Sequence, residues 1–228
     1  TYAALTNTTG SKNVAVGWAA LYSNTTANEN TAVGYQALYS NTTGNDNVAV
    51  GWGALFSNTT SAAGTAVGRK ALYSNTTGLY NVATGYQALE LNTTGSYNVA
   101  YGMQSLARNT TASNNTAVGY QALYANTTGS ANIAIGYHAL QNNTTASNNI
   151  AIGQSALDVA TTANSNIAIG RDAGVALTSA ANENVMIGYQ AGKSLTTGSY
   201  QNTLIGTNSG NDLTDSSSYN TCVGNNSG

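Results

Sequence analysis

The sequence predicts an all-β protein, a parallel β-roll or β-solenoid built from short and nearly identical coils. The main observation is a glycine that follows a run of small and β-branched residues. It recurs with a period of 17 from Gly17 to Gly170 and with a period of 18 from Gly170 to Gly224. A fixed short period over a long stretch is typical of solenoids, and a coil of this length is only about half of a helical repeat. The β-branched residues before the glycine favour strands.

The first element of each coil is a short strand that precedes this glycine, as in "NVAVG", "NTAVG" and "NIAIG". Its first position is Val, Thr or Ile, its third is Val or Ile except at Thr84 and Tyr101, and its middle position is Ala until Ala168. Successive side chains of a strand point to opposite faces, so one face is β-branched and the other is alanine. The narrow coil can bury one face within itself. We expect the alanine face to need a further cover, from the opposite strand or from a neighbouring chain, which favours an oligomer.

The second element is the segment after the glycine, which reads "GYQALYSNTTG" in its fullest form. Its recurring Ala-Leu pair, Ala20 and Leu21 in the first coil, predicts the second half of the core. Asn-Thr-Thr then predicts a turn, because Asn tolerates left-handed backbone conformations. Stacking puts equal side chains about 4.8 Å apart, where Asn and Thr can hydrogen-bond along a column. A further Asn precedes every strand except the one after Gly64.

A change of coil length divides the chain. Residues 1–169 are expected to form 17-residue coils, and residues 170–228 to continue the solenoid with 18-residue coils and a variant corner. In the longer coils the Leu four positions after the glycine becomes Gly, as at Gly174, and a Leu appears three positions later, as at Leu177. The core of these coils is therefore expected to be filled from a different corner.

Composition excludes several classes of function. The chain has six Lys or Arg and eight Asp or Glu, with a net charge of −2, so it lacks the basic stripe of a nucleic-acid-binding protein. It has no run of about 20 apolar residues that could span a membrane. The single Cys222 and the single His138 lie far apart in sequence, and no second ligand stands at zinc spacing. The carboxylates are scattered over different coils. We therefore expect no catalytic residue, no metal site, no cofactor and no enzymatic activity.

One enzyme class shares a short motif with this chain. "IGYQA" at 187–191 fits the hexapeptide pattern of left-handed β-helix acyltransferases, and 18 is three times six. That pattern should recur three times in each coil of such an enzyme, whereas here it occurs once. A shared tight corner that needs glycine explains the match better.

Aromatic residues form two columns. The second column contains Tyr22, Tyr39, Phe56, Tyr73 and Tyr124. The first column directly follows the regularly spaced glycine and is interrupted by Arg69, Met103, Gln154 and Arg171. Such rings offer an apolar face and a polar tip, so they could stack on sugars, or they could pack across coil corners or between chains. The interruptions make the first column the better candidate for glycan contact; it comprises Trp18, Tyr35, Trp52, Tyr86, Tyr120, Tyr137 and Tyr189.

The Asn-Thr-Thr triplet occurs nine times and leaves two further hypotheses open. Each triplet is formally an acceptor for N-glycosylation, although a repeated turn explains it as well. A ladder of Thr also suggests ice binding. Two adjacent Thr side chains alternate between faces, however, so they do not form a flat rank of two Thr on one surface.

The motifs "NVAVG", "NIAIG" and "NTAVG" resemble the head repeats of trimeric autotransporter adhesins, and "GYQALYSNTTG" is similar to repeats of phage tail fibres and large bacterial surface proteins. The resemblance covers essentially the whole chain. It implies a homotrimeric fibre that is extracellular, on a cell surface or on a virion tail, and that displays or makes contacts to a host or surface glycan. The alternatives are a self-assembling extracellular filament subunit, which would join end to end, or an ice-binding solenoid.

Overall fold

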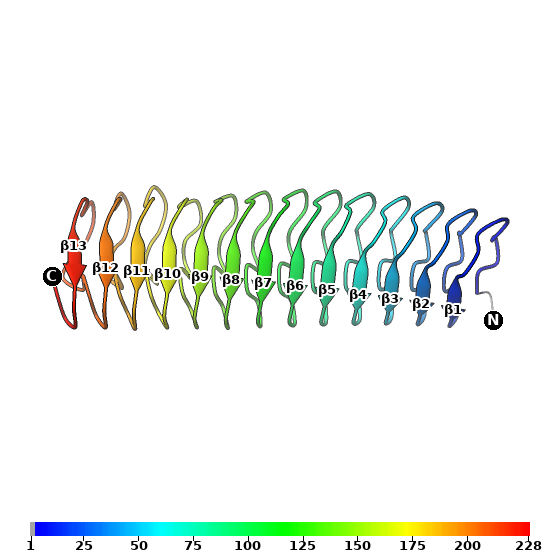
Figure 1. Cartoon of the computed structure of the whole chain (residues 1–228), viewed down its shortest axis with the longest axis horizontal. Coiled ribbons are helices and arrows are strands. Elements are labelled where there is room, and N and C mark those ends of the chain that lie inside the picture. Colours follow the sequence, from blue (N-terminus) through cyan, green and yellow to red (C-terminus); the bar gives the residue numbers. More distant parts are fainter. Residues whose placement is uncertain (1–2) are drawn as a thin grey trace. The chain divides into compact units, whose positions relative to one another are not determined.

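The computed structural model describes residues 3–228, which contain thirteen strands of three residues and no helix (Figure 1). They belong to two compact units that meet in sequence between Asn114 and Asn115. Every coil contributes one strand, at the place that the sequence predicts. In unit 1 the strands are β1 (Val14–Val16), β2 (Thr31–Val33), β3 (Val48–Val50), β4 (Thr65–Val67), β5 (Val82–Thr84) and β6 (Val99–Tyr101). In unit 2 they are β7 (Thr116–Val118), β8 (Ile133–Ile135), β9 (Ile150–Ile152), β10 (Ile167–Ile169), β11 (Val185–Ile187), β12 (Thr203–Ile205) and β13 (Thr221–Val223).

Within each unit the strands pair in parallel, in chain order and without a slip. Val14 lies beside Thr31 and Thr31 beside Val48, so equal coil positions are neighbours. The step from β10 to β11 pairs Ile167 with Val185 and accommodates the extra residue outside the strand. The predicted all-β parallel solenoid of short coils is confirmed in both units.

The sequence predicts a cover for the alanine face from the opposite strand or from a neighbouring chain, and in the structure that face is already buried within the single chain. The middle residues of the strands point into the coil and are fully buried from Ala32 onward to Leu204, whereas the first and third residues point outward. The reason is the width of the coil. Leucines such as Leu38 and Leu55 are fully buried in the same coils, and a narrow core that already holds a leucine fits an alanine on the strand better than a larger residue. The β-branched face is therefore the one left outside.

The longer coils exchange large and small residues across this core. In the shorter coils, Leu stands opposite Ala. In the longer coils, Gly174 and Gly192 replace Leu, and the inward strand residue becomes Met186 or Leu204. A Cβ atom on Gly192 would lie 2.8 Å from the sulfur of Met186 and 3.0 Å from a methyl of Leu204. Close packing requires this exchange of large and small residues. The predicted filling of the core from a different corner accompanies it, because Leu177 and Leu195 are fully buried.

Two internal ladders of asparagine connect successive coils. From Asn24 to Asn143 the Asn of each Asn-Thr-Thr turn is buried. The side-chain amide of Asn58, for example, donates to Asn41 Oδ1 at 2.8 Å and to the carbonyl of Ser61 at 3.1 Å. The Asn before each strand forms the second ladder: Asn47 donates its backbone N–H to Asn30 Oδ1 at 2.9 Å. Both ladders satisfy polar groups that a narrow core would otherwise leave unpaired, and they confirm the hydrogen-bonded columns that the sequence predicts.

The second ladder is interrupted at Gly64, and Ser61 compensates. The Asn before a strand also donates to a carbonyl of the next turn, as Asn81 does to Gly95 at 2.7 Å. Gly64 has no side chain to reach the corresponding carbonyl of Gly78. The hydroxyl of Ser61 donates to that carbonyl instead. The serine, which stands where most coils have Gly or Ala, thus supplies the missing donor.

Candidate functional site

The outward face of the strands is the first candidate surface. The first and third residue of every strand are Val, Ile or Thr, apart from Tyr101, and all are half-buried or exposed in the single chain. Ile133 retains 37% of its accessible surface and Tyr101 retains 61%. No strand in residues 3–228 carries a charged residue. A sheet with one face in water normally carries polar residues on that face. Parallel sheets, in contrast, are normally covered on both faces and are apolar on both. This face therefore has the composition of a buried surface.

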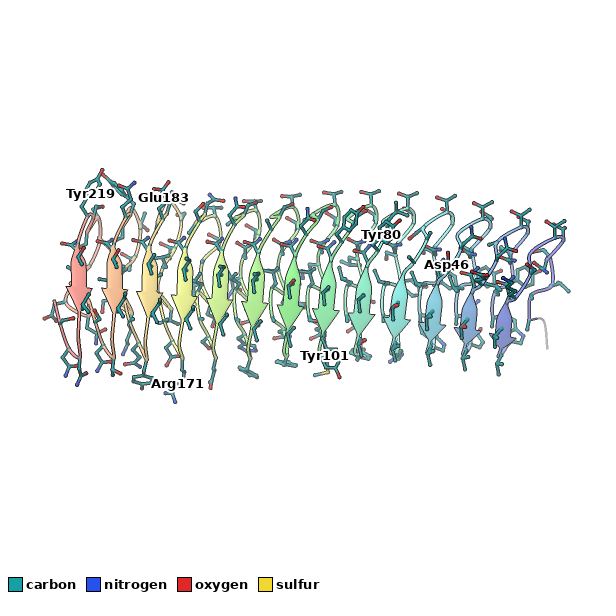
Figure 2. All side chains as sticks on the ribbon, in the orientation of Figure 1. Asp46, Tyr80, Tyr101, Arg171, Glu183 and Tyr219 are labelled. Carbon is teal, nitrogen blue, oxygen red and sulfur yellow. The ribbon has the colours of Figure 1, made fainter. Side chains whose placement is uncertain are left out.

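The ends of the strands carry different side chains. In unit 1, Figure 2 shows Asp46 and Tyr80 at the edge where the strands begin and Tyr101 at the edge where they end. In unit 2, Glu183 and Tyr219 project where the strands begin, and Arg171 projects where they end (Figure 2). The glycine and the first aromatic column follow the strands directly, so that column runs along the edge where the strands end.

The rings of the first aromatic column stack on one another from coil to coil. In unit 1 the ring centroids of Trp18 and Tyr35 lie 4.8 Å apart and those of Tyr35 and Trp52 lie 6.1 Å apart, with interplanar angles of 13° and 2°. In unit 2, Tyr120 and Tyr137 stack at 5.4 Å. Each ring covers a face of its neighbour, so these pairs present ring edges outward. The proposed contact with glycans, which stays a prediction, would be made there through edges, hydroxyls and indole N–H groups rather than through ring faces.

Arg69 continues this column instead of interrupting it. Its guanidinium carbon lies 5.3 Å from the ring centroid of Trp52 and 5.7 Å from that of Tyr86, so a cation stands where a ring would be. Arg171 lies in the same way over Tyr189, at 5.1 Å. From the sequence, both arginines are expected to interrupt the aromatic column. Their coil position, which is that of the aromatic residues, could have identified them as members of it, because a guanidinium stacks on rings as another ring does.

The second aromatic column also stacks, with 5.2 Å between Tyr22 and Tyr39, 5.1 Å between Tyr39 and Phe56, and 4.9 Å between Phe56 and Tyr73. The two columns meet at a hollow of about 220 Å³, which is lined by Leu5, Trp18, Ala19, Tyr22 and Tyr39.

A further aromatic pair, Tyr80 and Tyr97, stacks at 5.2 Å at the opposite edge of the strands. Sequence spacing does not reveal this pair, because the residues in its column differ from coil to coil.

The Asn-Thr-Thr turns bear directly on the glycosylation hypothesis. From Asn24 to Asn143 the turn asparagines are at most 1% exposed, and the amide of Asn92, for example, is bonded to Asn75 at 2.7 Å and to Gly95 at 2.9 Å. A folded coil thus offers no free amide to a glycosyltransferase at these positions. The first Thr of a turn bonds the next coil, as Thr76 does to the carbonyl of Thr93 at 3.0 Å, and the second Thr, such as Thr94, is exposed. The first Thr of a turn, such as Thr93, is thus half-buried, and the second is exposed.

His138, the single histidine, interacts with the titratable side chain of Asp158. Its ring stacks on Tyr137 with 3.8 Å between centroids, and its Nε2 is buried without a hydrogen-bond partner. Asp158 is half-buried, and burial raises its pKa, while the charge of His138 and a hydrogen bond from Asn142 act in the opposite direction. Over residues 3–228, no three His, Cys, Asp or Glu side chains are placed to hold a metal ion. Each coil also contains one strand, where the acyltransferase pattern would supply three.

The part of the chain that the structure describes contains no helix able to cross a membrane. No family model, curated protein or solved structure matches this chain.

Proposed function

We propose that this chain is a structural and adhesive repeat segment of an extracellular fibre, carried on a cell surface or a virion tail. Several copies associate along their β-branched faces, and the outer columns of the coils contact surface glycans. The observation that carries the proposal is the sheet face described above, which is uncharged and β-branched in nearly every coil and lies outside the core of its own chain.

The size of this face supports association between copies. A strand of this length is about 10 Å long and strands lie about 4.8 Å apart, so each strand offers about 50 Å² and each unit about 300 Å² in projection. The face of each unit taken by itself is thus more than a third of the area of about 800 Å² that each partner contributes to a standard interface. Accessible area exceeds this flat projection because side chains protrude.

A second copy fits this face better than an unrelated protein. Its side chains recur at the strand spacing of about 4.8 Å, and only a partner with the same spacing can place a side chain against every coil. The resemblance to adhesin heads and tail fibres sets the expected number of copies at three. Adhesion through such a fibre gains strength from many weak contacts that bind together.

Light scattering tests the association. We expect a mass near three times 23.1 kDa for the native protein, which falls to one chain on denaturation. Ile135→Lys places a charge on the outer face, where the side chain is 38% exposed in the single chain, and should shift the mass towards one chain without loss of circular dichroism. Thr145→Lys, on an exposed turn position, is the matched control and should keep the mass. A native monomer, or an unchanged mass for Ile135→Lys, contradicts the proposal.

Two other functions remain candidates. Very large and broadly distributed species in the same measurement would favour a filament that grows end to end, because open strand edges template pairing. Ice binding is favoured by the column of exposed second threonines, accompanied in some coils by a hydroxyl two positions on, as in Thr94 with Ser96 and Thr128 with Ser130. A monomer that shapes ice crystals would establish that function instead.

A further inference from the structure

Arg69 in unit 1 is a cation held between two aromatic rings. The guanidinium lies over the rings of Trp52, one coil before it, and of Tyr86, one coil after it, at 5.3 Å and 5.7 Å from their centroids. Both faces of the guanidinium are thus occupied by rings. Its N–H groups lie in the plane of the group, so they remain available along the outer rim, and the residue is exposed.

No carboxylate neutralises Arg69 among the residues that the structure describes. Its neighbour Lys70 is paired, because Nζ of Lys70 lies 3.2 Å from Oε1 of Glu90 in a largely buried contact and also over the ring of Tyr73 at 5.2 Å. The side chains of this pair satisfy each other. Arg69 is therefore the charge that this cluster leaves unpaired.

Unit 2 contains the matched case. Arg171 occupies the coil position of Arg69 and lies over Tyr189 at 5.1 Å, but the next residue is Asp172 instead of Lys70. The Arg171 Nε donates to Asp172 Oδ2 at 3.2 Å. One chain thus holds a neutralised and an unpaired version of the same arginine at the same coil position.

We propose that Arg69 binds the carboxylate of an acidic sugar in a surface glycan, with the exposed edges of Trp52 and Tyr86 flanking the sugar ring. The planar fork of a guanidinium matches the two coplanar oxygens of a carboxylate and donates two parallel hydrogen bonds to them. Rings on both sides fix the orientation of the fork and reduce the conformational entropy lost on binding. The site rests on the proposed glycan contact and names its ligand class: a uronic acid or another carboxylated sugar.

One such site binds weakly, and an assembly of several copies repeats it. Loss of a charge-assisted pair of this kind weakens binding about tenfold or more. Because repeated sites on one fibre bind together, an acidic polysaccharide is expected to bind more tightly than a short oligomer of the same sugar.

Fluorescence of Trp52 reports on the site directly. Trp18 is the other tryptophan, so Trp18→Phe leaves Trp52 as the only reporter. The full chain is titrated at low salt with oligogalacturonate, its methyl ester, dextran sulfate and dextran. We expect binding to oligogalacturonate and none to the ester or to dextran.

Three variants separate the charge from the fork. Arg69→Gln should weaken binding about tenfold or more, and Arg69→Lys should weaken it less, because it keeps the charge and loses the fork. Arg171→Gln changes the net charge equally and should leave binding unchanged. Unfolding midpoints establish that each variant is folded.

The proposal is overturned if Arg69→Gln binds as the parent does, if the ester binds as well as the acid, or if no galacturonate binds. Binding to dextran sulfate alone would overturn the choice of a carboxylate. Light scattering on the same samples keeps this test apart from the proposed function. An intact assembly that binds no acidic sugar contradicts the role of Arg69 alone, whereas a single-chain mass contradicts assembly.

Discussion

The buried asparagine of the Asn-Thr-Thr turn stabilises the stack of coils, and Asn92 lies well inside unit 1. Its amide donates to Asn75 Oδ1 at 2.7 Å and to the Gly95 carbonyl at 2.9 Å, and its Oδ1 accepts from the amide of Asn109 at 2.7 Å. Asn92→Ala removes all three bonds and leaves the buried Asn75 oxygen without this donor.

The expected loss follows from these contacts. A net contribution of about 1 kcal/mol for each of three hydrogen bonds gives about 3 kcal/mol, and the unsatisfied oxygen adds to that loss. The matched control is Thr94→Ala in the same turn. Thr94 is exposed, and such surface substitutions change the free energy of unfolding by no more than about 0.5 kcal/mol.

Guanidinium unfolding followed by circular dichroism measures both variants. Hydrogen exchange at the amides of Thr93 and Thr94 adds a local measurement, because coils of a repeat protein can open separately. We expect a clear fall in the midpoint for Asn92→Ala and faster exchange at these amides. If Asn92→Ala stays within about 0.5 kcal/mol of the parent chain, the ladder does not carry the stability assigned to it.

Four further substitutions test other parts of the structure. Gly51→Ala should destabilise by about 3 kcal/mol or more, because Gly51 has a φ of 135° and its Cβ atom would lie 2.6 Å from the carbonyl oxygen of Gly68; an unchanged unfolding midpoint would contradict this. Ser61→Gly should destabilise, because it removes the hydroxyl that bonds the Gly78 carbonyl, and Gly64→Asn should reduce that loss by restoring an Asn donor; a double-mutant cycle measures the coupling, and additive effects would refute the exchange of donors. Burial raises the pKa of Asp158, so the folded chain keeps this proton over a pH range in which the unfolded chain has lost it, and stability falls as the pH rises through that range. Asp158→Asn should therefore raise the free energy of unfolding at pH 7 by less than about 1 kcal/mol and leave it unchanged below about pH 3. A lower free energy of unfolding at pH 7 would contradict a raised pKa of Asp158.

The fold was predictable because every coil repeats nearly the same sequence pattern. The glycine period, the β-branched strand positions and the Asn-Thr-Thr turn locate the strands and the turns to the residue, from Val14–Val16 to Thr221–Val223. Hydrogen-bonded columns of Asn followed from stacking equal side chains at the strand spacing.

The side of the strand that faces inward was not predictable from periodicity. Both faces of the strand are apolar, so alternation alone does not choose between them. The choice depends on the opposite wall, where leucines such as Leu72 adopt a left-handed backbone with φ of 51° and fill the space that a Val or Ile would need. Positive φ is unfavourable for Leu, and propensity rules therefore do not suggest it.

Of the two arrangements that the sequence left open for the first aromatic column, contact with sugars or packing across coil corners or between chains, the structure shows its rings stacked from coil to coil. Sequence spacing gives the columns, whereas stacking follows from side-chain rotamers. The sequence therefore suggested ring faces for sugars, and the structure places edges outward and puts Arg69 between Trp52 and Tyr86.

The central claim is that a second copy covers the β-branched face, and thiol accessibility tests it most directly. With Cys222 replaced by Ser, a cysteine is introduced at Ile133, which is 37% exposed in the single chain, or at the exposed Thr145 of the turn. If copies cover the face, the thiol at 133 should react with a maleimide many times more slowly than the thiol at 145, and denaturation should abolish the difference. Equal rates in the native protein would show that the β-branched face is open to water and would contradict the account.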